Sequence, residues 1–198
     1  MRRLGLLLLT GSATLLVFGF WIPLKALLAQ ELLALAWAKS QAGQEVQRPW
    51  PWADTWPVAR LAFPDLGQSL IVLEGGHGES LAFGPGRVPT GAAGPWIIAG
   101  HRDTHFRHLG ELVPGSEVRL QGRDGQWRRF QVASTQVVDS RRAWIDPSRL
   151  PEHSLLLITC YPFDSFDSGG PLRYVVTAKP WPASGDPGDG PDDRFARL

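Results

Sequence analysis

Apolar positions form one long uninterrupted run at the start of the chain and many short runs after it. The long run, Leu4–Leu24, contains no charged residue. A helix rises about 1.5 Å per residue, so this run can cross a hydrocarbon core of roughly 30 Å. Arg2 and Arg3 precede it, and such basic flanks stay on the cytoplasmic side. We therefore predict a transmembrane signal anchor over residues 1–24, with the rest of the chain exported.

A cleaved signal peptide is the alternative interpretation of this N-terminal run. Small-x-small cleavage sites occur at 34–36 and 36–38, but both lie beyond Lys25 and well past the apolar stretch. The stretch also exceeds the core of a signal peptide, which is usually ~7–15 residues long. These lengths favour a retained anchor.

Residues 25–57 form a second segment with a different pattern. Positions 25–41 remain rich in Leu and Ala with polar residues interspersed, which predicts a helix that continues out of the bilayer or lies along its surface. A Pro-rich stretch follows with Trp50, Trp52 and Trp56. We expect these indoles to pack on the folded domain, since burial of apolar area is favourable by ~25 cal/mol per Å². A membrane-interface or partner-binding role is the alternative, because Trp is common at such interfaces.

Residues 58–180 show short apolar runs separated by Gly, Pro and Asp, which is typical of an all-β barrel or sandwich. Short helical turns are expected at Gly78–Phe83 and Thr104–Leu109, with Asp103 placed to cap the second one. The predicted strands are Val58–Phe63, Ser69–Leu73, Pro95–Ala99, Glu117–Leu120, Gln126–Val132, Ser134–Val138, Ser154–Thr159 and Leu172–Ala178.

Charge and composition narrow the function further. The formal net charge is +1, which argues against a nucleic-acid partner. Residues 181–198 are rich in Pro, Gly and Asp without a hydrophobic period, so we predict a disordered tail there.

The chain has one cysteine, Cys160, at the end of the apolar run that begins at Ser154. Most lone cysteines are buried and inert, but two further residues favour a nucleophile. His101 ends the apolar run from Pro95, and Arg173 begins the last predicted strand. If the strands around Cys160 and Arg173 form an antiparallel hairpin, both residues lie at the same end of the sheet. A thiol, an imidazole and a guanidinium that meet there suffice for acyl transfer.

Three segments carry a resemblance to a known family. Leu156–Cys160 resembles the T-L-x-T-C signature of sortases, the cysteine transpeptidases that act on L-P-x-T-G-like sorting signals, with Leu156 in place of the first Thr. The segments Ala99–Phe106 and Thr159–Phe163 are similar to those of the Gram-negative sortases called class GN, which are close to class D. The resemblance covers about residues 50 to 180.

The resemblance implies an eight-stranded β-barrel in which Cys160, His101 and Arg173 are the catalytic residues, with no cofactor and no metal. The implied partners are an exported protein with an LPXTG-like C-terminal signal and an unknown amine acceptor. The implied location is the cytoplasmic (inner) membrane, crossed once, with the catalytic domain on the periplasmic or exterior side. The weaker candidates for substrate binding are Thr159, Leu81, Ala82, Pro85, Asp103 and the loop Phe163–Gly170.

Three alternatives stay open at this point. The run from His101 through Asp103 and His105 to His108 is dense in metal ligands, although a catalytic zinc needs three well-directed ones. An L,D-transpeptidase also uses a cysteine, but its compact Ser-His-Gly-Cys motif is missing and His101 precedes Cys160 by 59 residues. A non-catalytic envelope domain that only binds a partner is the third.

Overall fold

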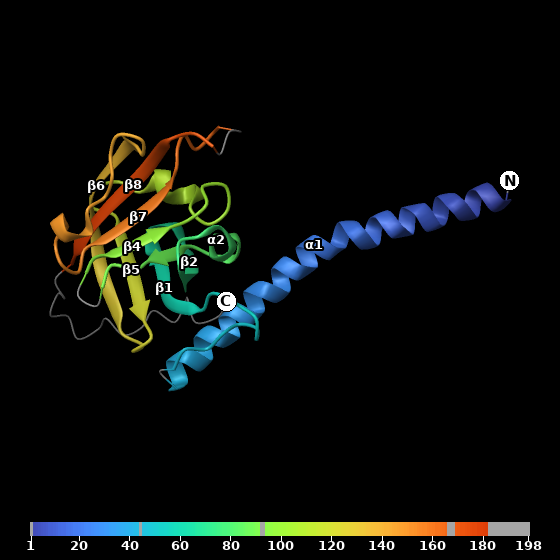
Figure 1. Ribbon diagram of the computed structural model, residues 1–198, viewed down its shortest axis with the longest axis horizontal. Helices are drawn as coiled ribbons and strands as arrows, with labels where there is room; N and C mark the ends of the chain where they lie inside the picture. Colours follow the sequence, from blue (N-terminus) through green and yellow to red (C-terminus); the bar gives the residue numbers. More distant parts are fainter. Residues whose placement is uncertain (1, 44, 92–93, 166–168, 182–198) are drawn as a thin grey trace.

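The computed structural model describes residues 2–43, 45–91, 94–165 and 169–181. Helix α1 (Arg2–Gly43) is a single helix that includes Pro23, and its N-terminal half projects away from the rest of the chain (Figure 1). The N-terminal helix therefore extends well beyond residue 24. The predicted disordered tail lies almost wholly outside the described residues.

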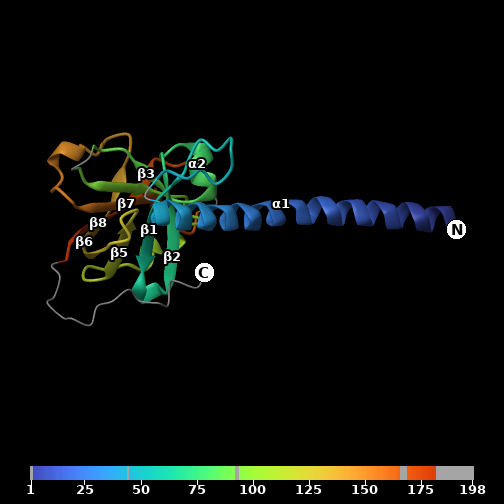
Figure 2. The ribbon, with the colours of Figure 1, turned by 90° about the horizontal axis from the view of Figure 1, so that it is seen from below.

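Eight strands form a closed barrel in the order β1-β2-β3-β4-β7-β8-β6-β5 (Figures 1 and 2). Neighbouring strands are antiparallel except for the pairs β2–β3 and β4–β7, which are parallel. The predicted all-β barrel with eight strands is thus confirmed. Its strands are β1 (Pro57–Phe63), β2 (Gln68–Glu74), β3 (Gly86–Val88), β4 (Trp96–Ala99), β5 (Glu117–Gly122), β6 (Trp127–Asp139), β7 (Leu155–Cys160) and β8 (Leu172–Pro180).

Two strand predictions were wrong, and the structure shows the cause of each error. Strand β3 was missed because it has only three residues and no apolar run. It lies so close to its neighbour that a Cβ at Gly86 would come within 2.0 Å of the Gly75 carbonyl oxygen. The two strands predicted over 126–138 are one strand, β6, whose pairing with β8 shifts register between Val132 and Ser134. This irregularity breaks the alternation of side chains without ending the strand.

The short helices also differ from prediction at one place. Helix α2 (Gly78–Phe83) lies where it was expected. The second turn forms as a 3-10 helix, η2 (Arg107–Glu111), which begins three residues later than predicted. Asp103 does not cap it, because its carboxylate binds the neighbouring Arg102 guanidinium instead. Two further 3-10 helices are η1 (Pro64–Leu66) and η3 (Pro147–Arg149).

The C-terminal half of α1 packs on the barrel near β1, β2 and α2 (Figure 2). Its buried positions recur every three to four residues, as expected for one face of a helix; they are Ala29, Leu33, Ala36, Trp37 and Ser40. Gln30 Nε2 donates a hydrogen bond to the Phe83 carbonyl oxygen at 2.8 Å. The helix and the barrel are therefore joined over several turns.

The Trp/Pro-rich segment behaves partly as predicted. Trp56 packs against the core of the barrel, and the ring of Trp50 lies 5.1 Å from that of Phe83. Trp52 is 79% exposed. The prediction that all three indoles pack on the domain is therefore wrong for Trp52.

Candidate active site

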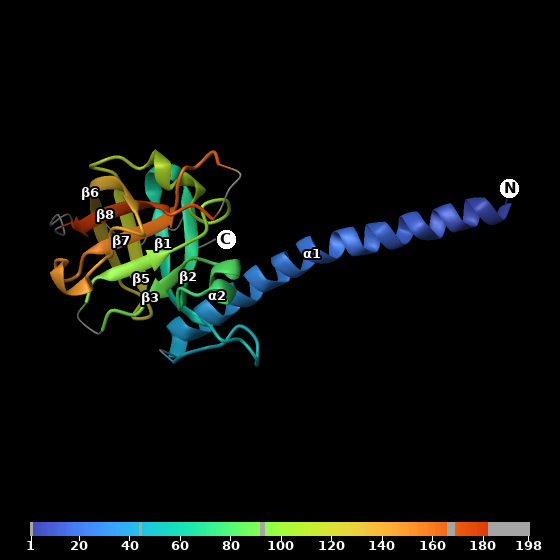
Figure 3. The ribbon, with the colours of Figure 1, turned by 45° about the horizontal axis from the view of Figure 1, so that its top comes forward.

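The ends of β4 and β7 bring His101 beside Cys160. The two strands are parallel, with Ala99 opposite Ile158, and they lie next to each other in the barrel (Figure 3). The pairing continues past β4, since Gly100 N donates to the Ile158 carbonyl at 3.0 Å. His101 follows directly and is exposed. The histidine therefore leaves the sheet at the level where β7 ends in Cys160.

The hairpin β7–β8 brings Arg173 to the same place. Cys160 and Arg173 are direct partners across this antiparallel pair, so their side chains lie on the same face with Cβ atoms about 4.5–5.5 Å apart. Arg173 Nη1 donates to the carbonyl oxygens of Gly170 at 2.6 Å and Leu172 at 2.8 Å. Cys160 and Arg173 are both partly exposed. The ends of β4 and β7 and the start of β8 therefore lie at one rim of the barrel.

Thr159, predicted as a weak substrate-binding residue, has a structural position instead. It is 2% exposed, and its hydroxyl donates to the Gly100 carbonyl oxygen at 2.8 Å. The bond ties the residue before Cys160 to the residue before His101. Gly100 itself is closely packed, since a Cβ there would come within 2.8 Å of the Phe106 ring.

Arg102 is a residue of this rim that the sequence analysis did not single out. Its side chain is only 3% exposed, although an isolated buried charge is costly. The guanidinium binds both Asp103 oxygens, at 2.7 and 3.1 Å. It also donates to the Pro162 carbonyl at 2.6 Å and the Ser165 carbonyl at 2.7 Å. Arg102 therefore joins the turn after β4 to the loop after Cys160.

The charges around this arginine are coupled. The hydrogen bonds to Asp103 raise the pKa of Arg102, and a negative charge on the nearby Cys160 sulfur acts in the same direction. Conversely, the hydrogen bonds from Arg102 lower the pKa of Asp103. The site thus holds a positive charge close to the sulfur of Cys160.

Aromatic rings support the turn that follows Cys160. Tyr161 and Tyr174 are stacked with centroids 6.2 Å apart, and Phe163 meets Tyr174 edge-on at 5.1 Å. The peptide bond between Tyr161 and Pro162 is cis. Phe163 and Tyr174 also pack against the barrel core. The backbone around the thiol is therefore well supported.

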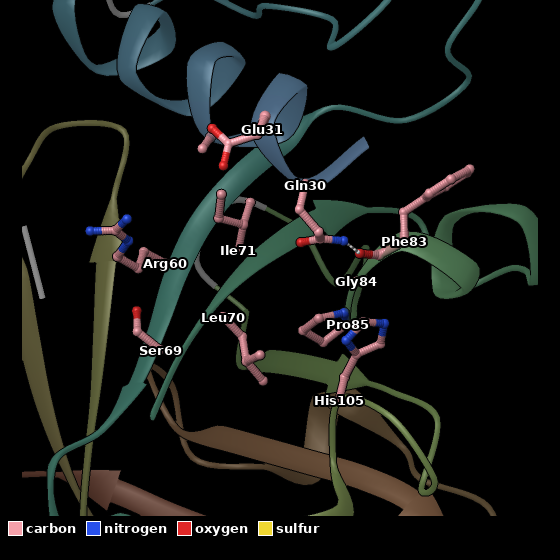
Figure 4. A pocket seen from close by; sticks show the side chains of 11 residues that line it. Gln30, Glu31, Arg60, Ser69, Leu70, Ile71, Phe83, Gly84, Pro85 and His105 are labelled. Carbon is pink, nitrogen blue, oxygen red and sulfur yellow. Dashed lines mark hydrogen bonds between the residues drawn. The ribbon is translucent and has the colours of Figure 1, made fainter. Parts of the chain in front are cut away.

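The other predicted substrate-binding residues lie on and after α2. Leu81 is half-buried and Ala82 is exposed; Ala82 lines a groove shared with α1. Pro85 is buried and lines a cavity of about 180 Å³, together with Gln30, Glu31, Arg60 and His105 (Figure 4). Asp103 is 63% exposed beside Arg102. The predicted loop Phe163–Gly170 lies partly outside the described residues.

His105 predicts a pH dependence of stability. Burial in this cavity and the nearby His101 lower the pKa of His105, while Glu31 and Arg60 line the same space. The folded state therefore favours neutral His105. The contribution of neutral His105 to the free energy of unfolding is fully present above the unfolded-state pKa of about 6.5. It is lost as the pH falls through the lower pKa of the folded state. We expect the melting temperature to fall between about pH 7 and 5, and to fall less in His105→Gln.

The matched control for this experiment is His77→Gln, which alters an exposed histidine on the loop before α2. Its pH profile should follow the wild type. If the melting temperature of His105→Gln fell with pH as steeply as that of the wild type, the cavity would not couple protonation of His105 to folding.

The metal interpretation finds no support in the geometry. In the part of the chain that the structure describes, no three His, Cys, Asp or Glu side chains gather as a metal site requires. Asp103 is engaged by Arg102, and His108 pairs with Glu111.

Comparison with known proteins identifies the class to which this barrel belongs. The sortase domain family matches residues 61–181, so the chain belongs to the sortase family. Sortase D of Bacillus subtilis (strain 168) is 32% identical over 123 residues, and the match spans 60% of this chain and 61% of that protein. The chain thus matches about three fifths of the length of this relative.

Solved structures agree on the fold. A Clostridium perfringens sortase D5 transpeptidase superposes with a TM-score of 0.57 at 18% identity, covering 78% of this chain and 98% of that one. The catalytic domain of sortase D from B. anthracis gives a TM-score of 0.50 at 28% identity, and the match covers 63% of this chain and 87% of that one.

Proposed function

We propose that this sortase is a membrane-anchored cysteine transpeptidase of class GN, with Cys160, His101 and Arg173 as its catalytic residues. One observation carries the proposal: Cys160 pairs directly with Arg173 across β7 and β8, while His101 extends from the strand parallel to β7. A nucleophile, a proton carrier and a fixed cation are the groups that acyl transfer needs.

In the first half of the reaction, the Cys160 thiolate attacks the carbonyl carbon of the scissile peptide bond. A C–S bond forms, and the carbonyl oxygen gains negative charge beside the Arg173 guanidinium. The C–N bond then breaks as His101 donates a proton to the leaving amine. The product is a thioacyl enzyme.

In the second half, an amine acceptor attacks the thioester carbonyl. His101 takes a proton from the attacking nitrogen, a new amide bond forms, and the C–S bond breaks to regenerate the thiolate. If water attacks instead, the outcome is hydrolysis. The two halves leave His101 and Cys160 in their starting protonation states.

The proposed substrate is an exported protein with an LPXTG-like C-terminal signal. The proposed location is the cytoplasmic membrane, with the barrel on the exterior side. Within the described residues, one segment of α1, Phe18–Gly43, is long and apolar enough to cross a membrane. We place the anchor at residues 1–24, which overlap the start of this segment, because the run without charged residues lies there and follows two arginines.

The test is transpeptidation by the full chain in lipid vesicles. A panel of fluorescent LPXTG-like peptides is supplied with hydroxylamine or a short amine-terminated peptide as acceptor. We expect an amide product that depends on the acceptor, and a thioester-linked mass on the enzyme when the acceptor is omitted.

A cysteine-reactive peptide vinyl sulfone provides a second readout. If it labels Cys160 but no peptide of the panel is cleaved, the thiol is reactive and the substrate assignment is wrong. If neither occurs, the chain is a binding domain and the enzymatic proposal is wrong.

A further inference from the structure

The segment that follows α1 doubles back along the helix. After Gly43 the chain reverses and runs beside α1 before it enters β1 (Figures 1 and 3). Trp50 and Trp52 of this segment share a groove with Lys25 and Leu32 of the helix. At a rise of 1.5 Å per residue, those helix positions lie about 16 to 27 Å from Gly43 along the helix axis, toward the N-terminus. The two indoles are thus carried back toward the N-terminal apolar stretch.

The segment is held in this position by specific contacts. Arg48 Nη1 donates to the Ala53 carbonyl at 2.9 Å, and Ala53 N donates to the Trp50 carbonyl at 3.0 Å. Thr55 Oγ1 donates to the Glu74 carbonyl of β2 at 2.6 Å. Trp52 nevertheless stays exposed at the tip of this braced loop.

The groove between the loop and the helix is largely apolar and has a volume of about 770 Å³. Helix α1 contributes Leu28 and Leu32, which are both exposed, and α2 contributes Phe83. Lys25 and Asp54 are its charged residues and have opposite signs. An exposed apolar surface of this kind marks an interaction site, and the balanced charge argues against an electrostatic partner.

The groove is continuous with the proposed anchor. Exposed apolar residues run along α1 from the proposed anchor, residues 1–24, to the groove. They are Phe18, Phe20, Trp21, Leu24, Leu27 and Leu28. Lys25 Nζ lies 4.8 Å from the centroid of the Trp21 ring. A lysine and tryptophans at the end of an apolar span are typical of the boundary between headgroups and acyl chains.

We propose that this groove and Trp52 lie in the outer boundary layer of the membrane, with the phospholipid leaflet that α1 enters as their partner. The inference rests on the anchor stated under the proposed function and extends it. Because α1 packs on the barrel, contact of the Trp50–Trp52 loop with lipid provides a second point of attachment. Two points fix the tilt of the barrel relative to the membrane, whereas a single helix leaves it free to rotate.

The test measures the membrane depth of position 52 in the full chain. Cys160→Ala removes the native thiol, and Trp52→Cys introduces a site for a nitroxide label. The protein is reconstituted in vesicles of phosphatidylcholine, with and without phosphatidylglycerol. The rate at which the nitroxide collides with oxygen, which partitions into lipid, is compared with the rate at which it collides with a water-soluble nickel chelate. The matched control is Trp144→Cys, a tryptophan site that is 84% exposed on the loop between β6 and β7.

We expect an oxygen-to-nickel collision ratio several-fold higher at position 52 than at position 144, with or without the anionic lipid. A label at Phe18→Cys separates this inference from the anchor. If position 18 lies in the bilayer while position 52 resembles position 144, the anchor stands and the proposed lipid contact is wrong. If position 18 also resembles position 144, the anchor is wrong and the lipid contact with it.

Two further outcomes would assign the groove to a different occupant and overturn the inference. Spin–spin broadening between labels at position 52 would indicate a second copy of this chain. Shielding of position 52 only after addition of a substrate with its hydrophobic span would indicate the substrate. Trp52→Ser, compared with Trp144→Ser, gives a label-free check: only the former should reduce the quenching of tryptophan fluorescence by brominated acyl chains.

Discussion

Cys160→Ala should abolish transpeptidation and leave no enzyme-linked acyl adduct. The chain has no second cysteine, so no other thiol can form the C–S bond that the mechanism requires. The position is partly exposed at the end of β7, so loss of one sulfur should leave the fold intact. The measurements are product formation with an acceptor amine and intact mass after incubation with peptide alone.

His101→Ala and Arg173→Ala provide the matched comparison for this result. Both retain the thiol, so adducts should still form, but more slowly by about 10²–10⁴-fold without the proton carrier. Loss of the fixed cation should cost about 10²–10³-fold. Undiminished turnover by Cys160→Ala would refute the thioacyl mechanism. Wild-type rates in the other two variants would remove those residues from the catalytic set.

Arg102→Lys should produce the second large effect, through the position of the catalytic groups. A lysine cannot make the paired bonds to Asp103 and also reach the carbonyls of Pro162 and Ser165. Two acceptors lose their donor, so stability should fall by about 1–3 kcal/mol. The loop after Cys160 is then released from the His101 turn, and an error of about 1 Å in such a site costs on the order of 10²-fold in rate.

The control for Arg102→Lys is Arg141→Lys. Arg141 makes a similar pair of bonds to Asp139, at 3.2 and 3.1 Å, but it is exposed. The Arg141→Lys substitution should change neither stability nor turnover appreciably. The measurements are thermal unfolding, kcat and KM separately, and the pH profile of Cys160 alkylation. A lower melting temperature with unchanged kcat and alkylation would show that Arg102 only stabilises the fold.

Much of this architecture was predictable from local patterns. Alternating apolar positions and turn residues identified seven of the eight strands, because each of those strands carries its own run. The ends of the runs at positions 101, 160 and 173 placed the chemistry at strand termini, and strand pairing made their convergence plausible. The length of the apolar stretch at residues 4–24 likewise predicted a helix without any tertiary information.

Other features depended on contacts between distant parts of the chain. Strand β3 exists because Gly86 fits against Gly75, a constraint that a three-residue segment does not reveal. Asp103 appeared as a helix cap because local sequence cannot show a competing partner, and in the structure Arg102 binds it. Arg102 itself gained a role only through carbonyls 60 and 63 residues away.

By itself the sequence determined most of the secondary structure and the chemical nature of the rim, because periodicity, turn chemistry and residue type are local properties. The tertiary structure decided which side chains share a buried bond and which stay exposed. It placed Arg102 between two loops, packed Trp56 against the barrel core and left Trp52 exposed beside the helix that precedes it. Those outcomes depend on how the barrel closes and on how α1 packs against it, and no short window of residues contains that information.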